Sequence, residues 1–284
     1  MKSFKNIDFI SFIHNNIILL MSALGDRMKN YESEYKILIP RDHYYIIRLD
    51  GVSFSKFTSS FHKPFDRLFI LSMVATTHDL MNKFHPRTGY CHSDEITLIF
   101  DKCDENQNHI YDGKVQKLCS IVAGYCSVRF NYNLNLLLTN DYSVTFINKI
   151  KRYEQCFDAR ILSFPELGEI TNHMIWRSVH DCERNAIQTY ARYEFGHKAI
   201  MKKNSNEMKQ MLLEKGIDWN DVPLYLKHGI YCKKVLIEKE TEHGNCMRGV
   251  LINKCFNISY SEEINQLLIN KYWTNDVETQ EFVI

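Results

Sequence analysis

Two acidic positions in the first half of the chain could act together on a phosphate group. Asp50 follows residues 44–49, a run rich in aromatic and β-branched side chains that predicts a strand. Asp94 lies in a short turn, Ser93–Glu95, between two further predicted strands at 88–92 and 96–100. Taken alone, each acid is typical of a solvated turn, so the chemistry depends on whether they meet.

If the first strand and this hairpin are neighbours in one sheet, Asp50 and Asp94 approach each other. Two carboxylates at close range repel unless a cation lies between them. Mg²⁺ suits such a pair, because it binds one or two carboxylates and takes its other ligands from water and phosphate. Two Mg²⁺ ions about 3.5–4 Å apart would support an in-line phosphoryl displacement. Gly51 would let a triphosphate approach the backbone closely.

Three lysines could hold the phosphates. Lys63 precedes a predicted helix, and Lys114 and Lys117 open another, where the helix start favours an anion. Exposed lysines are common, so an ordinary surface role explains each one equally well. The histidine nearest to the acids, His92, has no Ser/Asp or Cys/His partner that the sequence can place, which disfavours nucleophilic catalysis.

The elements that must position these residues form a recognisable order. A helix is predicted from Pro64 to residue 84, a second from about residue 114, a polar Asn-rich connection over 131–141, and a strand over 157–165. The order strand, helix, strand, strand, helix, strand is a split β-α-β repeat of ferredoxin-like type, which predicts an α+β fold. Its two helices would cover one face of the sheet and leave the other free for a site.

The second half of the chain reads as helical and basic. Helices are expected over 176–203 and 206–215, with Arg184, Lys198 and Lys202 among their basic residues. This local basic surface indicates contact with nucleic acid, although a solvated helix face is the alternative. We therefore divide the chain into an N-terminal extension (1–20), a catalytic domain (21–165) and a helical region (166–284) that ends in a peripheral segment.

The amino-acid composition indicates which classes of protein the chain can belong to. The 284 residues are 45% hydrophobic and 24% charged, which suits one generous domain with a real core. A net charge of +1 excludes a uniformly basic coating. Nine cysteines without a CxxC motif indicate a reducing compartment and argue against a zinc site or a disulfide scaffold.

No segment is apolar enough to predict a membrane span. Residues 1–20 carry Lys2 and Lys5 among bulky apolar residues, a basic amphipathic pattern compatible with a mitochondrial presequence. A disordered or docked tail on a cytoplasmic protein is the alternative.

Five segments together resemble the tRNA-His guanylyltransferase family. They are 47–58 (IRLDGVSFSKFT), 62–66 (HKPFD), 90–100 (YCHSDEITLIF), 157–160 (FDAR) and 176–181 (WRSVHD), in the family's order and spacing. The resemblance covers roughly residues 21–235.

The resemblance implies a polymerase-palm fold, assembly as a homotetramer and two Mg²⁺ ions. It implies addition of nucleotides to the 5′ end of tRNA, after ATP activates that end. By motif, Asp50, Asp94 and the Gly51 carbonyl would bind metal, and Ser93 and Glu95 would support the turn. Lys63, Lys114 and Lys117 would hold triphosphate, so that ATP, GTP and other nucleoside triphosphates are the expected substrates.

One segment departs from the family pattern. Guanylyltransferases that act on tRNA-His carry His-Ile-Asn-Asn after the Trp-Arg motif, where this chain has Glu183, Arg184, Asn185 and Ala186. This change resembles the branch that rebuilds truncated tRNA 5′ ends by copying the opposite strand. Arg184, Asn185, Lys198 and Lys202 would then hold the RNA while base pairing supplies the sequence information.

We therefore expect a template-dependent 3′-to-5′ nucleotidyltransferase that repairs or edits tRNA 5′ ends. Addition of a single G to tRNA-His is the first alternative. A nucleotide cyclase is a second, because palm-like sheets with paired acids also serve that chemistry. A catalytically idle RNA-binding protein is a third, disfavoured by the intact Asp50 and Asp94.

Overall fold

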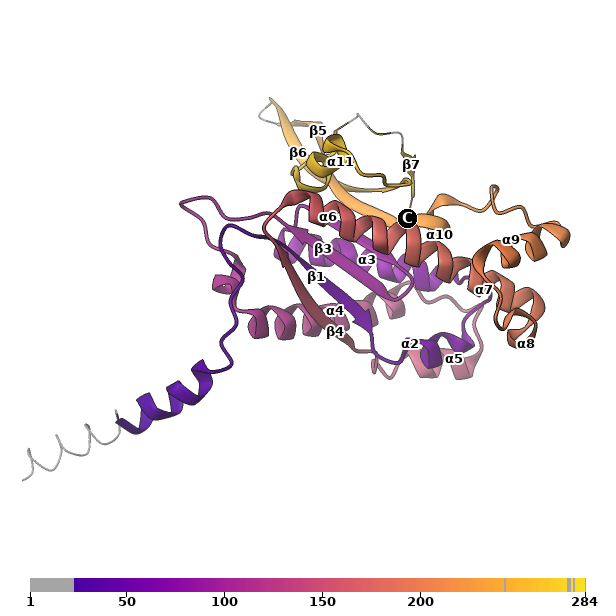
Figure 1. Cartoon of the computed structure of the whole chain (residues 1–284), viewed down its shortest axis with the longest axis horizontal. Helices are drawn as coiled ribbons and strands as arrows, with labels where there is room; N and C mark the ends of the chain where they lie inside the picture. Colours follow the sequence, from indigo (N-terminus) through magenta and orange to yellow (C-terminus); the bar gives the residue numbers. More distant parts are fainter. Residues whose placement is uncertain (1–22, 243, 275–276, 278, 284) are drawn as a thin grey trace, which may run out of the picture.

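The computed structural model describes residues 23–242, 244–274, 277 and 279–283, so the predicted extension 1–20 lies outside the described residues. Within them, one seven-stranded antiparallel sheet has the order β4-β1-β3-β2-β5-β6-β7 (Figure 1). Its strands are β1 (Tyr44–Gly51), β2 (Thr88–His92), β3 (Glu95–Phe100), β4 (Phe157–Phe164), β5 (Ile230–Thr241), β6 (Gly244–Cys255) and β7 (Gln280–Glu281).

The predicted split β-α-β order is confirmed in the first half. Helix α3 (Arg67–Phe84) connects β1 to β2, and helix α4 (Val115–Leu136) connects β3 to β4. Helix α3 begins three residues later than predicted, because the Asp66 carboxylate caps it by accepting a hydrogen bond from the Phe69 N–H. The fold class is therefore α+β, as the sequence predicts.

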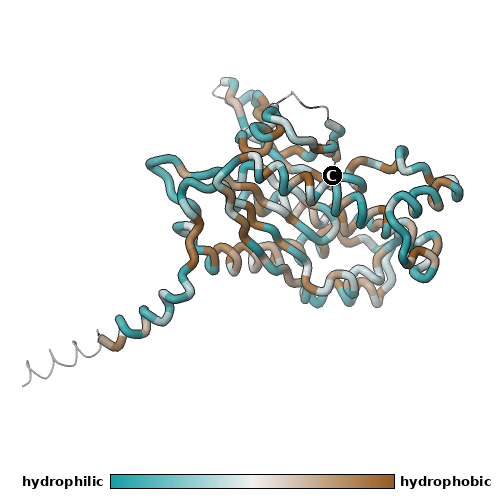
Figure 2. Tube along the Cα trace, in the orientation of Figure 1, coloured by the Kyte–Doolittle hydropathy of each residue, from teal (hydrophilic) through white to brown (hydrophobic). Residues whose placement is uncertain are grey.

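Alternation along β1 divides its side chains between the two faces of the sheet. Tyr45, Ile47 and Leu49 join the main hydrophobic core under α3 and α4. Ile46 belongs to a second core on the opposite face. Asp50 has the same parity as Ile46, so it lies on that second face, at the end of the strand. Figure 2 shows the hydrophobic residues running along these central strands.

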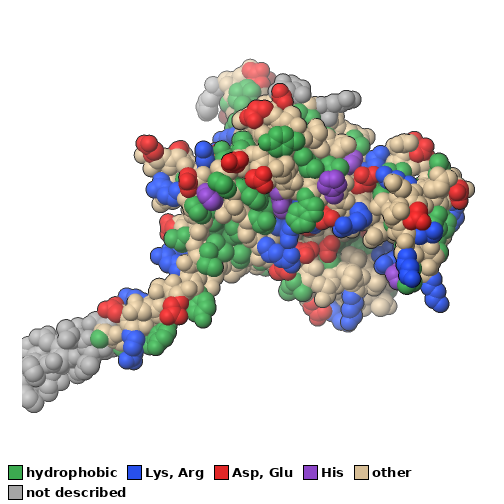
Figure 3. Space-filling model, viewed as in Figure 1, with side chains coloured by type: hydrophobic (Ala, Val, Ile, Leu, Met, Phe, Trp, Pro, Cys, Tyr) green, Lys and Arg blue, Asp and Glu red, His purple; other side chains and the backbone are tan. Residues whose placement is uncertain are grey.

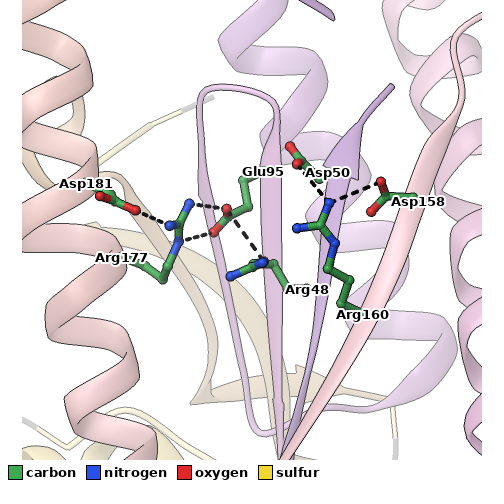
Figure 4. Close-up of polar contacts among 7 residues, drawn as sticks. All are labelled: Arg48, Asp50, Glu95, Asp158, Arg160, Arg177 and Asp181. Carbon is green, nitrogen blue, oxygen red and sulfur yellow. Dashed lines mark hydrogen bonds and ion pairs between the residues drawn. The ribbon is translucent and has the colours of Figure 1, made fainter. Parts of the chain in front are cut away.

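The expectation of an uncovered second face is wrong for most of its length. Helix α6 (Leu167–Met174), the π-helical segment η3 (Ile175–Cys182) and helix α11 (Glu262–Ile269) supply the apolar residues that pack there against Ile46 and Ile99. The charged end of this face, which carries Asp50, lies beside η3 (Figure 4).

The Asn-rich stretch 131–141 is not a connection over its first half. Helix α4 continues through it to Leu136, with Asn131 and Asn133 buried. The Asn131 side chain donates to the Ser127 and Gln155 carbonyls, both at 2.7 Å, and Asn133 donates to Asp79 at 2.8 Å. These bonds satisfy amides that would otherwise disfavour a helix interior.

The second half contributes both helices and strands. Helices α7 (Glu183–Phe195), α8 (His197–Ile200), α9 (Ser205–Glu214) and α10 (Leu224–His228) enclose a small core of their own. Strand β5 then pairs with β2, and β5 with β6 forms a long ribbon. One sheet therefore crosses residue 165, where we divide the chain.

The remaining described elements are short. They are α2 (Phe54–Phe57), η1 (Thr58–Ser60), η2 (Ile110–Gly113) and α5 (Val144–Ile150). A helix over 23–33 extends away from the body (Figure 1). All nine cysteines are free thiols, and no described helix is long and apolar enough to cross a membrane.

Candidate active site

The end of β1 and the β2–β3 turn meet, and this contact brings Asp50 beside Asp94. The Gly51 N–H donates to the Asp94 carbonyl at 3.1 Å, and Asp50 lies opposite Glu95 in the β1–β3 ladder. Ser93 adopts a left-handed conformation with φ 51°, and its hydroxyl donates to Asp94 Oδ1 at 3.0 Å. Gly51 is required here, because a Cβ would lie 2.4 Å from the Phe54 ring.

The surroundings of Asp94 disfavour its negative charge. Burial raises the pKa of Asp94, and the charge of Asp50 raises this pKa further, while hydrogen bonds from its own backbone and from Ser93 work in the opposite direction. A cation between the two carboxylates would relieve both effects.

The two carboxylates suit Mg²⁺, because this ion takes its remaining ligands from water and phosphate. The described residues contain no group of three or more His, Cys, Asp or Glu that could hold a metal by themselves. Substrate oxygens would therefore complete the shell.

Glu95 does not belong to the turn. It is the first residue of β3, its residue exposure is 5%, and its carboxylate is held by Arg177. Arg177 Nε donates to Glu95 Oε1 at 2.9 Å and a second guanidinium nitrogen bonds Oε2, while Arg48 Nε lies 4.0 Å from the same oxygen. Glu95 therefore fixes the base of the hairpin, and its charge is already balanced by the two arginines.

The π-helical segment η3 anchors this clamp. Arg177 also bonds Asp181 (Figure 4). Asp181 forms a second ion pair with Arg184 at 2.7 Å. The guanidinium carbons of Arg177 and Arg48 lie 4.9 Å and 5.9 Å from the centre of the Trp176 ring. Segments of π-helix are rare and occur often at functional sites, which agrees with this position beside the acids.

Two charged residues of β4 complete the site on its other side. Asp158 lies directly opposite Asp50 in the β1–β4 ladder. Arg160 Nη2 lies between them, 3.8 Å from Asp50 Oδ2 and 3.4 Å from Asp158 Oδ2 (Figure 4). The cation nearest to Asp50 among the described residues thus comes from β4.

A pocket opens beside the hairpin, and it brings three of the predicted site residues together. Lys63, Ser93 and Asn185 line it, over an apolar wall of α3 and α7 that includes Met73 and Ala186. The Lys63 ammonium donates to the Thr58 carbonyl at 2.8 Å and is exposed, so it can turn toward a phosphate. His92 also lines the pocket. Burial and the Arg177 charge lower the pKa of His92 to about 3, so His92 is neutral.

Lys114 and Lys117 lie at the start of α4, away from Asp50 and Asp94. The start of α4 pairs with residues that precede β1, because the Val115 N–H donates to the Ile37 carbonyl. The other end of α4 reaches the acid pair, where the Phe130 ring packs on Phe157, the residue opposite Gly51. A single chain therefore does not bring Lys114 and Lys117 to Asp50 and Asp94.

The predicted RNA-contacting residues divide into two groups. Arg184 is engaged with Asp181, and Asn185 faces the pocket. Lys198 and Lys202 are exposed, and neither has a side-chain hydrogen bond or ion pair in the part of the chain that the structure describes. In Figure 3, basic and acidic side chains are interspersed both at the α7–α9 end of this face and near its centre.

Asp158, Arg160 and Arg177 are the site residues that sequence reasoning does not assign. All three lie in the FDAR and WRSVHD segments, so the family motifs are the sequence signal that could have identified them. Their roles depend on strand register and on contacts such as Arg177–Glu95, which joins residues 82 positions apart.

Comparison with known proteins agrees with this geometry. Residues 25–165 match the model of the tRNAHis guanylyltransferase family. An uncharacterized protein of Acanthamoeba polyphaga mimivirus is 42% identical over 271 residues, which cover 91% of this chain and 93% of that protein. The tRNA(His) guanylyltransferase of Debaryomyces hansenii is 29% identical, over 71% of this chain and 77% of the enzyme.

Solved structures give the same result. A bacterial tRNA(His) guanylyltransferase-like protein in complex with ATP matches with a TM-score of 0.64 and 28% identity, over 80% of this chain and 91% of that one. A GTP complex of such a protein matches with a TM-score of 0.60 and 26% identity, over 81% and 90%. The chain therefore belongs to the tRNA-His guanylyltransferase family and is a nucleotidyltransferase.

Proposed function

We propose that this protein is a template-dependent 3′-to-5′ nucleotidyltransferase that adds nucleotides to the 5′ end of truncated tRNAs. The observation that carries the proposal is the Asp50–Asp94 pair, because Ser93, which bonds Asp94, also lines the pocket that contains Lys63 and Asn185. The related bacterial structures with ATP and GTP support nucleoside triphosphates as substrates.

The proposed reaction has two steps. In the first, a 5′-phosphate oxygen of the RNA bonds to the α-phosphorus of ATP, and pyrophosphate leaves. In the second, the 3′-hydroxyl of the incoming nucleotide attacks the activated 5′-phosphate, and AMP leaves. Mg²⁺ bound at Asp50, Asp94 and the Gly51 carbonyl would neutralise phosphate charge and activate the hydroxyl. Ser93 orients Asp94, and Lys63 would hold the triphosphate.

The segment that departs from the family pattern supports templating. Glu183 Oε1 accepts hydrogen bonds from Lys209 Nζ at 2.6 Å and from Trp219 Nε1 at 2.9 Å. Burial works to raise the pKa of Glu183, but these bonds and the Lys209 charge outweigh it and lower this pKa. The residue that takes the place of the histidine in the family's His-Ile-Asn-Asn segment is thus engaged inside the protein. Base pairing with the opposite strand would supply the specificity instead.

A homotetramer, tRNA as the partner and a mitochondrial location complete the proposal. Sedimentation equilibrium would measure the mass of the assembly against the 33.7 kDa chain. Imaging of the full chain beside one that starts at Met21 would test the role of residues 1–20.

The decisive assay offers the protein two tRNAs that lack the first 5′ nucleotide and differ only in the base opposite the gap. All four nucleoside triphosphates and Mg²⁺ are present, and full-length tRNA-His is a third substrate. We expect the added nucleotide to complement the opposing base in each truncated tRNA. Addition of G regardless of that base, with preference for full-length tRNA-His, would support the single-G alternative. The Asp50→Asn variant is the matched inactive control.

A further inference from the structure

Charges on β1 and β4 are arranged in an unusual way at the active site. Arg48 lies directly opposite Arg160, and Asp50 lies directly opposite Asp158. One face of the sheet therefore carries a pair of arginines and, two residues further along, a pair of aspartates. Like charges directly opposite on neighbouring strands are destabilising. The arrangement is stable only if each pair finds an opposite charge elsewhere.

The two arginines find different acidic partners. The Arg48 side chain is 13% exposed and turns toward Glu95 and Trp176. The Arg160 side chain is 54% exposed and turns toward the Asp50 and Asp158 carboxylates (Figure 4). Its distances to them, 3.8 Å and 3.4 Å, exceed those of a tight charged hydrogen bond, about 2.7–2.9 Å. Arg160 is therefore a loosely held, solvated cation placed between two acids.

A loosely held cation is easy to displace. Exposed ion pairs contribute about 0–1 kcal/mol, far less than a divalent ion gains from two carboxylates. Once such an ion neutralises Asp50, the guanidinium of Arg160 is released beside the metal. Its planar set of donors matches phosphate oxygens and keeps its charge at every working pH.

We propose that Arg160 is the resident counter-cation of Asp50 before metal binds, and that metal binding transfers Arg160 to a phosphate of the substrates. Arg160 is then a catalytic residue of the proposed reaction, on which this inference rests. The ligand is a phosphate group, carried either by the nucleoside triphosphate or by the 5′ end of the RNA.

The test compares wild type with Arg160→Gln and Arg160→Lys in two measurements. Mn²⁺ binding is followed by electron paramagnetic resonance without nucleotide or RNA, and steady-state kinetics are measured at saturating Mg²⁺. Arg152→Gln is the control, because Arg152 is also exposed and has no side-chain ion pair within the described ranges. We expect Arg160→Gln to bind Mn²⁺ ~2–5-fold more tightly, since a competing cation is gone. Its kcat should fall by ~100-fold or more, since a phosphate donor is gone. Arg160→Lys should lie between.

The kinetic data also identify the phosphate. A raised KM for nucleotide alone assigns Arg160 to the triphosphate, and a raised KM for 5′-phosphorylated RNA alone assigns it to the RNA end. Unchanged or weaker Mn²⁺ binding, or unchanged turnover, in Arg160→Gln would overturn the inference while leaving the proposed function intact. A wild-type protein that binds no Mn²⁺ would overturn both.

Discussion

At the scale of single residues, Asp94 combines catalytic potential with a cost to stability. Its folded-state pKa lies above the usual 3.8, chiefly because the carboxylate is half-buried, so the folded chain binds this proton more readily than the unfolded chain. The contribution of Asp94 to stability is therefore greatest at low pH, and it is lost as the pH rises through the folded-state value. At neutral pH, without metal, ionised Asp94 opposes folding.

Asp94→Asn should for this reason separate activity from stability. The variant keeps the shape of the turn but removes the charge, so we expect a higher Tm than wild type in metal-free buffer at pH 7. We expect turnover to fall by at least ~100-fold. Differential scanning fluorimetry and the tRNA extension assay measure the two effects. A lower Tm accompanied by lost activity would instead give Asp94 a structural role.

Asp50 and Asp94 are predictable from the sequence, because each follows or joins a strong strand pattern. The motif also names Glu95, but its burial is not predictable, because its sequence neighbours suggest a solvated turn and only the contact with Arg177 holds it inside. The role of Asp158 is not predictable either, because only the pairing register of β1 and β4 places it opposite Asp50.

At the scale of elements, η3 fixes the hairpin that carries Asp94. The Arg177 side chain, 13% exposed, connects Glu95 of β3 to Asp181 of η3. Arg184 pairs with the same Asp181 but is 54% exposed. These two arginines provide a matched comparison of buried and exposed ion pairs.

We expect Arg177→Ala to lower the free energy of unfolding by ~3–5 kcal/mol, because it leaves the Glu95 charge buried without its main partner. Arg184→Ala should lower it by at most ~1 kcal/mol. Urea denaturation of both variants gives the numbers. Equal effects would show that η3 does not clamp the hairpin through Glu95.

The elements of the first half follow from the sequence, since hydrophobic periodicity distinguishes its strands from its helices. The C-terminal end of α4 is missed because its buried asparagines bond to Asp79 and Gln155, which are distant in sequence. Strands β5 and β6 are missed for another reason. Much of their ribbon is exposed on both sides, so charged and apolar residues do not alternate between a core face and a solvent face.

At the scale of the whole molecule, charge is balanced overall but segregated locally. The net charge is +1, yet most cations of the α7–α9 region are already engaged, as in the pairs Lys209–Glu183, Lys203–Glu207 and Lys215–Glu194. Lys198 and Lys202 remain available for an RNA backbone. The far end of the β5–β6 ribbon projects away from this region (Figure 1). Lys239, near the end of β5, is exposed.

Reversing the charges of Lys198 and Lys202 together should weaken tRNA binding without changing the KM for ATP. Each lost phosphate contact should reduce the slope of log affinity against log salt by ~0.7–0.9. Filter binding at several salt concentrations measures this slope. Lys239→Glu is the control, and an equal loss in that variant would indicate that only net charge matters.

The central claim is that Asp50 and Asp94 together hold the divalent ion of a nucleotidyltransferase. Isothermal titration of Mg²⁺ into wild type, Asp50→Asn and Asp94→Asn tests it directly, with Asp141→Asn as a control at an exposed acid. The account predicts that each site variant loses at least ~10-fold in affinity and that the control does not. Wild-type affinity in both site variants would contradict it.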